Sequence, residues 1–366
     1  MKSNYKKLAP YIRQIDERNK DLEVKRLLGV SIEKRFIESI ANTIGTDMTS
    51  YKIVRKGQFA YGPVTSRNGD KVSIALLEED ECIISSSYIV FEITDTDTVL
   101  PEYLNLWFKR PEFDRYARFH SHGSAREIFD WEEMGNVTLP IPSIEEQQKI
   151  VDAYNAIERR IAIKRQINDN LESQAQAIYN EMFVMYCANE LPIGWLFQTL
   201  ENIAIIIAGG DRPQIFSDIK TSICNVPIYS NGVEQEGLYG YTDKAKVFKE
   251  SVTVSARGTV GFTCLRQIPY FPIVRLISVT PLSNIITAKY LYFFLKNSVL
   301  TSSGTSQQQL TVPDFRKIQI VVPTKEYMDQ FSNRIEPIFT YINANKVEIE
   351  QLTMLQHALL TQISSR

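Results

Sequence analysis

The histidine and acidic residues of this sequence form no evident catalytic or metal-binding motif. His120 and His122 lie two positions apart, but no third metal ligand such as a carboxylate is evident near them. Asp218 and Lys220 have an Asp-x-Lys spacing that occurs in nucleases, but no convincing acidic partner precedes them. A loop that contacts a polyanion is therefore the favoured interpretation of the two histidines.

Motifs for redox chemistry, nucleotide binding and methyl transfer are also missing. The four cysteines, Cys82, Cys187, Cys224 and Cys264, form no Cys-x-x-Cys pair, so we expect reduced thiols that are mostly buried. There is no GxxxxGK(S/T) phosphate loop, and the segment 208–211 lacks the third glycine of a dinucleotide-binding turn. No Asn/Asp-Pro-Pro-aromatic motif of amino-methyltransferases is present. The chain is predicted to bind or assemble other molecules, without a cofactor, a metal or a catalytic residue of its own.

Composition and charge are those of an ordinary folded protein. Of the 366 residues, 44% are hydrophobic and 23% are charged, and this length is typical of two domains. The net charge of −2 excludes a uniformly basic coat for nucleic acid, but it does not exclude a local basic face. Only residues 187–324 are net basic, with 12 Lys and Arg against 9 Asp and Glu. The longest aliphatic run, Ile203–Ala208, is too short to cross a bilayer, and no signal peptide is evident, so we expect a cytoplasmic protein.

An internal repeat with an offset of 181 residues organises the chain. Gly123-Ser124-Ala125-Arg126 aligns with Gly304-Thr305-Ser306-Gln307, and Ile141-Pro142-Ser143 aligns with Val322-Pro323-Thr324. The hydrophobic positions between these two matches align as well, and no gap is needed. Such self-similarity indicates two copies of one structural unit.

Each copy ends in an amphipathic pattern that predicts a helix of about 40 residues, which would be about 60 Å long. Ser143 and Thr324 are the expected N-caps. Hydrophobic residues then recur at alternating steps of three and four, which is the heptad seam of a coiled coil. The seam residues are Ile150, Tyr154, Ile157, Ile161, Leu171 and Ile178 in the first helix, and Phe331, Ile335, Ile338, Ile342, Ile349, Leu352 and Leu359 in the second.

The matching seams predict that the two helices pack on each other. Four polar seam residues, Lys164, Asn168, Asn345 and Gln356, would help to fix the register. The alternatives are that each helix packs on a separate globular core, or that the polar positions lie at an interface with a partner.

A segment of mixed helix and strand patterns precedes each long helix. Strand-like runs are Val72–Leu77, Tyr88–Ile93, Ser251–Ser255 and Ile273–Val279, and short aromatic helices are expected at Tyr103–Lys109 and Tyr290–Lys296. The predicted architecture is therefore an α/β (α+β) domain, a long helix, a second α/β (α+β) domain and a second long helix.

Two similar domains on a rigid spacer are suited to a target with two parts. Duplex DNA is itself pseudo-symmetric, so domains related by a pseudo-two-fold axis could read separated half-sites. Two other hypotheses stay open. One is a coiled-coil adaptor that assembles proteins without reading DNA, and the other is an enzyme with an unfamiliar site, which predicts activity from the purified chain alone.

Three stretches carry a resemblance to a known family. Leu139–Val151 contains a Pro-Ser-x-Glu-Glu-Gln-Gln run where the first long helix begins, Leu191–Trp195 lies at the start of the second domain, and glycine loops lie at 123–126 and 304–307. Together with the repeat, they make the chain similar, over nearly its whole length, to the specificity subunit of type I restriction–modification systems. The second helix start, Val322–Gln330, lacks the Glu-Gln-Gln run.

The resemblance implies a non-catalytic subunit that recognises double-stranded DNA. Two target-recognition domains (1–143 and 187–324) would each read half of a bipartite target, and two spacer helices (144–186 and 325–366) would form an antiparallel coiled coil that sets the half-site separation. Two modification subunits, which carry S-adenosylmethionine and methylate adenine, would dock on this scaffold. Restriction subunits would add cleavage driven by ATP and Mg, although the sequence does not distinguish a restricting system from one that only methylates.

Polar residues in two loops of the first domain are the candidates for contacts to bases. Base edges in the major groove are read by Arg, Lys, Asn, Gln, Ser and Thr side chains. A polar turn between strands carries Ser66, Arg67, Asn68 and Lys71, and the glycine loop carries His122, Ser124 and Arg126. An ordinary solvated hairpin is the alternative for the turn.

The second domain offers a comparable set of candidates for contacts to DNA. They are Arg212, Arg257, Thr259, Arg266 and Arg275, together with Gln307 and Gln308, which could pair with adenine or be ordinary surface residues. Because only this domain is net basic, we expect the partner subunits to supply much of the affinity for the DNA backbone.

Overall fold

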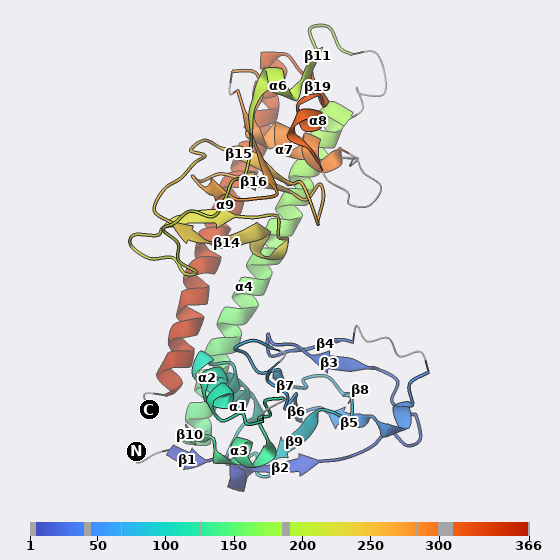
Figure 1. The fold of residues 1–366 in the computed structure, drawn as a ribbon, viewed down its shortest axis with the longest axis vertical. Helices are drawn as coiled ribbons and strands as arrows, with labels where there is room; N and C mark the ends of the chain where they lie inside the picture. The colour runs from blue at the N-terminus through green and yellow to red at the C-terminus, as the bar shows by residue number, and fades with distance from the viewer. Residues whose placement is uncertain are drawn as a thin grey trace. The chain divides into compact units, whose positions relative to one another are not determined.

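The computed structural model divides into two compact units, and both long helices contribute residues to each unit (Figure 1). The first unit comprises residues 1–165 and 346–366, and the second comprises residues 166–345. The structure describes residues 5–39, 45–66, 68–123, 126–184, 191–282, 284–298 and 310–364. Among the helices of these ranges, none combines the length and the hydrophobicity that a membrane-crossing helix requires.

The first unit is built from short strands followed by helices. Its strands are β1 (Tyr5–Lys7), β2 (Ile12–Ile15), β3 (Leu28–Val30), β4 (Phe36–Glu38), β5 (Lys52–Arg55), β6 (Phe59–Tyr61), β7 (Ile74–Leu76), β8 (Glu81–Ile84), β9 (Ile89–Ile93) and β10 (Thr138–Pro140). Its helices are η1 (Ala9–Tyr11), η2 (Met48–Ser50), α1 (Pro101–Phe108), α2 (Pro111–Phe119) and α3 (Trp131–Asn136), after which the long helix α4 (Ile144–Tyr179) begins.

The second unit follows the same plan. After α4 the chain makes one π-helical stretch, η3 (Asn180–Val184). The strands are β11 (Leu196–Thr199), β12 (Ala204–Ala208), β13 (Val226–Tyr229), β14 (Leu238–Thr242), β15 (Ser251–Ser255), β16 (Thr263–Arg266), β17 (Phe271–Pro272), β18 (Leu276–Pro281) and β19 (Gln319–Val322). The helices are α6 (Leu200–Ile203), η4 (Glu234–Gly237), α7 (Ala288–Asn297), α8 (Val312–Arg316) and the long helix α9 (Lys325–Ile363).

Both units contain a four-stranded antiparallel sheet with the same strand order. The order is β2-β9-β6-β7 in the first unit and β12-β18-β15-β16 in the second. The aromatic helix that follows each sheet, α1 or α7, contacts the last strand of that order. The units differ beside this sheet, where the first adds the pairs β3–β4 and β5–β8, and the second adds a three-stranded sheet in the order β14-β13-β17. The repeat that the sequence predicts is therefore a repeat of topology as well.

The observed strands lie at the expected runs, but two of them begin at least two residues later than expected, and the first is β7, which starts at Ile74 rather than Val72. The run Ile273–Val279 becomes β18 only from Leu276 onward. Arg275 has a φ of +71°, in the left-handed region, which ends regular pairing there. Ile273 makes a single parallel bridge to Gly210 instead. The expected start of this strand was therefore wrong by three residues, because a left-handed residue leaves no signal in the hydrophobic pattern.

In both units an equivalent hydrogen bond joins the aromatic helix to the strand that precedes the long helix. The hydroxyl of Tyr103 donates to the carbonyl of Pro140 at 2.9 Å, and the hydroxyl of Tyr290 donates to the carbonyl of Val321 at 2.6 Å. Both tyrosines are almost completely buried. A buried hydroxyl needs a partner, so this bond fixes the helix against β10 or β19.

The long helices begin at the expected caps. The Ser143 hydroxyl accepts the amide of Glu146, and the Thr324 hydroxyl accepts the amide of Tyr327, both at 3.4 Å. Each cap thereby satisfies one of the amides that a helix start leaves without a partner.

In each unit α4 and α9 run antiparallel to one another. In the first unit Val151 and Tyr154 share a core with Leu360 and Ile363, whereas Lys164 pairs with Glu348 at 2.8 Å. In the second unit the amide of Asn345 donates to Asn168 at 2.8 Å, and Arg334 pairs with Glu181 at 3.1 Å. Residue numbers fall along α9 as they rise along α4, which is the antiparallel arrangement. None of the thirteen seam residues is exposed.

The same helices also complete the core of each unit. Tyr179 and Phe183 pack with Tyr290 and Phe331 in one aromatic cluster, with ring centroids 4.7 to 6.3 Å apart. Val151 belongs to the core that holds Phe59 and Phe91 of the first sheet. The two interpretations of the helices, packing on each other or on separate cores, are therefore both correct.

Gln147 shows why the two helix starts differ in sequence. Its side chain is completely buried and makes three hydrogen bonds of 2.9 Å, accepting the amide of Leu100 and donating to the carbonyls of Thr98 and Pro142. The position 181 residues later is Met328, which lies in an apolar core. The Glu-Gln-Gln run thus contains a residue that binds three backbone groups in one repeat only.

We predict that Gln147→Met lowers the free energy of unfolding by about 2 to 4 kcal/mol, because it leaves one amide and two carbonyls without partners inside the protein. Urea unfolding of the full chain, followed by circular dichroism, measures this change. Gln148→Met is the matched control, since Gln148 is exposed and bonds only to Asp152, and its effect should stay within about 0.5 kcal/mol. Equal losses for the two variants would contradict this role of Gln147.

Candidate nucleic-acid interface

Two polar loops of the first unit lie against each other. Residues 62–73 connect β6 to β7, and residues 120–130 connect α2 to α3. His122 and Ile128 exchange backbone hydrogen bonds of 2.9 and 3.0 Å, which closes the glycine loop into a small hairpin. The amide of Thr65 donates to the carbonyl of Glu127 at 3.0 Å, and the amide of Phe129 donates to that of Pro63 at 2.8 Å. Residues predicted separately from the sequence are thus brought to one surface.

The side chains on this surface are polar and mostly exposed. Ser66, Lys71, His122 and Arg126 are exposed, and Asn68 is half-buried, with its amide 3.5 Å from the Ser73 hydroxyl. Lys71 pairs with Glu33 at 2.6 Å. Arg67 and Ser124 lie outside the described residues. We name this surface, made by the described residues of 62–73 and 120–130, the first loop pair.

Gly123 is required where the glycine loop turns. Its φ is +133°, a conformation that side chains strongly disfavour. A Cβ at this position would lie 2.1 Å from the carbonyl oxygen of Arg126. The loop can therefore take this tight shape only with glycine.

An equivalent surface exists in the second unit. Arg257 and Thr259 lie in the β15–β16 connection, which corresponds to the β6–β7 connection. The amide of Leu310 donates to the carbonyl of Ala256 at 2.8 Å, as Phe129 does to Pro63 in the first unit. We name this surface, made by residues 256–262 together with Leu310 and Thr311, the second loop pair. Gln307 and Gln308 lie outside the described residues.

Neighbouring segments hold the second loop pair in place. The amide of Ala256 donates to the carbonyl of Arg275 at 2.8 Å, so the exposed Arg275 lies beside this connection. The hydroxyl of Thr259 donates to the carbonyl of Asn231, and the amide of Asn231 donates to that of Arg257, both at 2.8 Å. The structure thus brings Arg257, Thr259 and Arg275 together. Arg212 is exposed on the connection after β12, with its guanidinium 4.7 Å from the ring centre of Phe216.

Arg266 does not belong to this surface. Only 3% of the residue is exposed, and its guanidinium lies 3.6 Å from the ring centre of Tyr229. The guanidinium also donates to the Thr253 hydroxyl at 3.0 Å and to the carbonyl of Glu236 at 2.5 Å. An arginine that is buried and bonded inside the protein is not available to a base, so we remove Arg266 from the candidate set. Its residue type alone made it a candidate, and nothing in the sequence indicated that it is buried.

A buried ion pair that the sequence did not reveal supports the first loop pair. Lys34 and Asp114 form this pair, and Lys34 also donates to the carbonyl of Val72 at 2.6 Å. The carboxylate of Asp114 accepts the amide of Val72 at 2.9 Å. Burial lowers the pKa of Lys34, and the charge of Asp114 opposes that shift. The pair joins the turn before β4, the end of the β6–β7 connection and α2.

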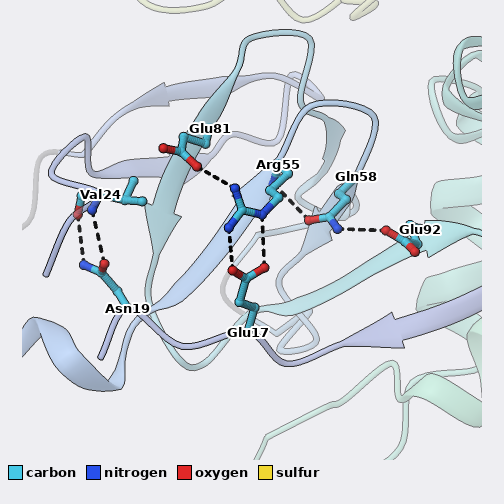
Figure 2. A network of polar contacts seen from close by, with 7 residues as sticks. All are labelled: Glu17, Asn19, Val24, Arg55, Gln58, Glu81 and Glu92. Carbon is cyan, nitrogen blue, oxygen red and sulfur yellow. Dashed lines mark hydrogen bonds and ion pairs between the residues drawn. The ribbon is translucent and has the colours of Figure 1, made fainter. Parts of the chain in front are cut away.

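Many charges of the first unit are committed to the fold. Figure 2 shows Arg55 in a two-bond contact with Glu17, at 2.5 and 3.1 Å, while its third nitrogen contacts Glu81 at 2.8 Å. In the same view Gln58 joins the Arg55 amide to Glu92, and Asn19 makes two bonds to the Val24 backbone. The bonds from Arg55 hold the pKa of Glu17 below its usual value. Arg55 is therefore a structural residue rather than a candidate for DNA contact.

The residues examined for metal and thiol chemistry do not assemble into a site. His120 contacts the Glu133 carboxylate at 3.2 Å, whereas His122 belongs to the exposed glycine loop. Within the described ranges no group of three or more His, Cys, Asp and Glu side chains could hold a metal ion. Cys82, Cys224 and Cys264 are buried thiols that form no disulfide within the described ranges, as expected, and burial raises the pKa of Cys82 to about 12. Cys187 lies outside the described residues.

We predict that Asp114→Asn lowers the free energy of unfolding by about 3 kcal/mol, because it leaves the buried ammonium of Lys34 without its counter-charge. Lys71→Met is the matched control at an ion pair whose lysine side chain is 47% exposed, and it should cost less than about 1 kcal/mol. Urea unfolding of the full-length variants gives both values. A loss for Asp114→Asn no larger than that for Lys71→Met would refute the proposed supporting role.

Comparison with known proteins places the chain in a family. The family model described as "Type I restriction modification DNA specificity domain" matches residues 34–173 and 192–354. A putative type I specificity subunit of Mycoplasma pneumoniae is 27% identical, over 66% of this chain and 64% of its own length. The HindI specificity subunit of Haemophilus influenzae is 22% identical, and the match covers 92% of each chain.

A solved structure shares the fold. The crystal structure of the type I restriction–modification S subunit from M. genitalium matches with a TM-score of 0.55 and 13% identity, over 98% of this chain and 95% of that chain. Because the family model matches well over half of the sequence, once in each repeat, the chain belongs to the type I restriction–modification DNA specificity family.

Proposed function

We propose that this chain is the DNA-specificity subunit of a type I restriction–modification complex and that each unit reads one half of a bipartite target in duplex DNA. The observation that carries the proposal is the occurrence of equivalent loop pairs on two domains with the same strand order. Each loop pair presents side chains of the types that read base edges. The relatives from Mycoplasma pneumoniae and Haemophilus influenzae are themselves named as specificity subunits.

The loop pairs suit base reading for a physical reason. A side chain that reads a base must be exposed, yet its backbone must be fixed so that the contact costs little entropy. Arg126 and His122 meet both conditions, since they are exposed on a loop closed by paired backbone hydrogen bonds. Arg257 and Thr259 lie on a connection that Asn231 bonds in two places.

Other subunits would supply the chemistry and part of the affinity. In this proposal the recognition domains are 1–143 and 187–324, and the helices 144–186 and 325–366 set the spacing and bind two modification subunits that use S-adenosylmethionine. Restriction subunits with ATP and Mg would complete the complex, in the cytoplasm. This chain would have no catalytic activity, and its modest charge leaves much of the contact with the DNA backbone to its partners.

We predict that cells expressing the chain with its modification subunit acquire adenine methylation in one bipartite motif with a fixed spacer. Single-molecule sequencing of genomic DNA detects the motif. In Arg126→Ala, one half of the motif should become less specific while the other half stays unchanged. Thr259→Ala should instead reduce the specificity of the other half of the motif, because each unit reads its own half-site.

Two exposed residues outside both loop pairs and both long helices supply the controls. Lys25→Ala and Lys249→Ala should leave both halves of the motif unchanged. A soluble complex that purifies intact and adds no methylation would exclude DNA reading and favour the adaptor hypothesis. Loss of specificity in both halves from either loop variant would contradict the assignment of one half-site to each unit.

A further inference from the structure

A large cleft in the first unit has walls from five separate segments. Its volume is about 950 Å³. The walls come from the turn 32–35, from Asp70 and Lys71 of the first loop pair, from α2, and from α4 and α9. The lining residues of α4 and α9 include Tyr154, Arg165 and His357. We name it the α2 cleft.

Positive charge predominates in the α2 cleft. Its lining includes seven Lys and Arg side chains but only four Asp and Glu side chains. Three of the acidic residues already have cationic partners, in the pairs Lys34–Asp114, Lys71–Glu33 and Lys109–Glu158. Among the described residues, no carboxylate lies within 4.0 Å of the guanidinium of Arg35 or Arg165, both of which are exposed. The cleft therefore has cations available to an incoming anion.

The α2 cleft is continuous with the first loop pair. Arg118, in the cleft wall, donates to the carbonyl of Gly69 at 2.9 Å and pairs with Glu127 at 3.3 Å. Gly69 belongs to the β6–β7 connection and Glu127 to the glycine loop. The Lys34–Asp114 pair holds the same connection against α2 from inside. A duplex whose bases meet the loop pair would consequently bring its sugar–phosphate backbone to the rim of the cleft.

We propose that the α2 cleft binds the phosphodiester backbone of the DNA beside the first half-site, with Arg165 and Arg35 as the principal contacts. This inference rests on the proposed function, because the bound DNA is the same duplex that the loop pair reads. Phosphate contacts of this kind fix the register of a protein on DNA but carry no sequence information. The cleft would therefore increase affinity for every sequence and hold the loop pair in the groove.

Arg165→Ala is the central test, in the complex of the full chain with its modification subunit. Binding is measured by fluorescence anisotropy, on duplexes with the methylated motif and on unrelated duplexes, at several salt concentrations. Loss of one phosphate contact should weaken binding to both duplexes about fivefold and reduce the slope of log affinity against log salt by about 1. Arg165→Lys should restore most of the affinity, because lysine also binds phosphate as a point charge.

Arg159→Ala is the matched control, since Arg159 is exposed on the same helix but is absent from the cleft lining. A second measurement uses duplexes in which neutral methylphosphonates replace the phosphates beside the first half-site. They should weaken binding by the wild-type complex about fivefold and cause no further loss in Arg165→Ala. This result would place the lost contact at those phosphates.

The outcomes separate the two proposals. If the wild-type complex does not prefer motif DNA over unrelated DNA, the proposed function fails. If the preference is present but Arg165→Ala binds as Arg159→Ala does, only the cleft proposal is overturned. A third outcome is that the Arg165→Ala chain partly separates from the modification subunit on size-exclusion chromatography, while the fraction that stays in the complex binds DNA as the wild type does. The cleft would then bind an acidic segment of a protein, and the phosphate proposal would be wrong.

Discussion

The apolar seam of the two long helices is the interaction on which the rest of this structure depends. In each unit one part of the seam packs helix on helix, while neighbouring residues such as Tyr179 and Val151 enter the core of the domain. The domain cannot rotate on its helices without exposing those residues, which would cost about 1.5 to 3 kcal/mol for each large side chain. Continuous packing thereby fixes the position of the domain's loops relative to the long helices. The Asn168–Asn345 bond helps to fix the register, since it joins the buried Asn345 to a half-buried asparagine of the other helix.

The two repeats share the contacts that stabilise the domain and differ in the strands beside its central sheet. The strand order, the tyrosine bond to the last strand and the backbone bond between the loops recur in both units. The additional strands differ, as β3–β4 and β5–β8 in one unit and β13, β14 and β17 in the other. A scaffold maintained by backbone pairing and buried aromatic side chains permits such changes, because the described residues of the variable strands lie outside the core clusters that include the aromatic helix and the long helices. Two domains of one architecture can in this way carry different chemical surfaces.

Periodic and repeated features could be predicted from the sequence, whereas contacts between distant residues could not. The heptad steps located both long helices, and the alignment at 181 residues located the caps Ser143 and Thr324. The Lys34–Asp114 pair joins positions 80 residues apart, and neither residue has a spacing that suggests a partner. Arg266 shows the complementary difficulty, because the type of a residue does not give its depth. The left-handed turn at Arg275 is a backbone state that a hydrophobic pattern does not encode.

The distribution of paired and available cationic side chains explains how a nearly neutral chain can bind DNA. A positive charge contributes to phosphate binding by displacing the cations that are condensed on the DNA, and a guanidinium already paired with a carboxylate has little net charge left with which to do so. Arg55 and Arg266 are bonded within the fold in this way, whereas Arg165 and Arg35 face an open cleft. Total charge therefore underestimates the local attraction at the first loop pair. The same argument predicts that different residues of one domain determine affinity and specificity. Exposed loop residues contact the bases and determine specificity, whereas the cleft beside them contacts the phosphates and determines affinity.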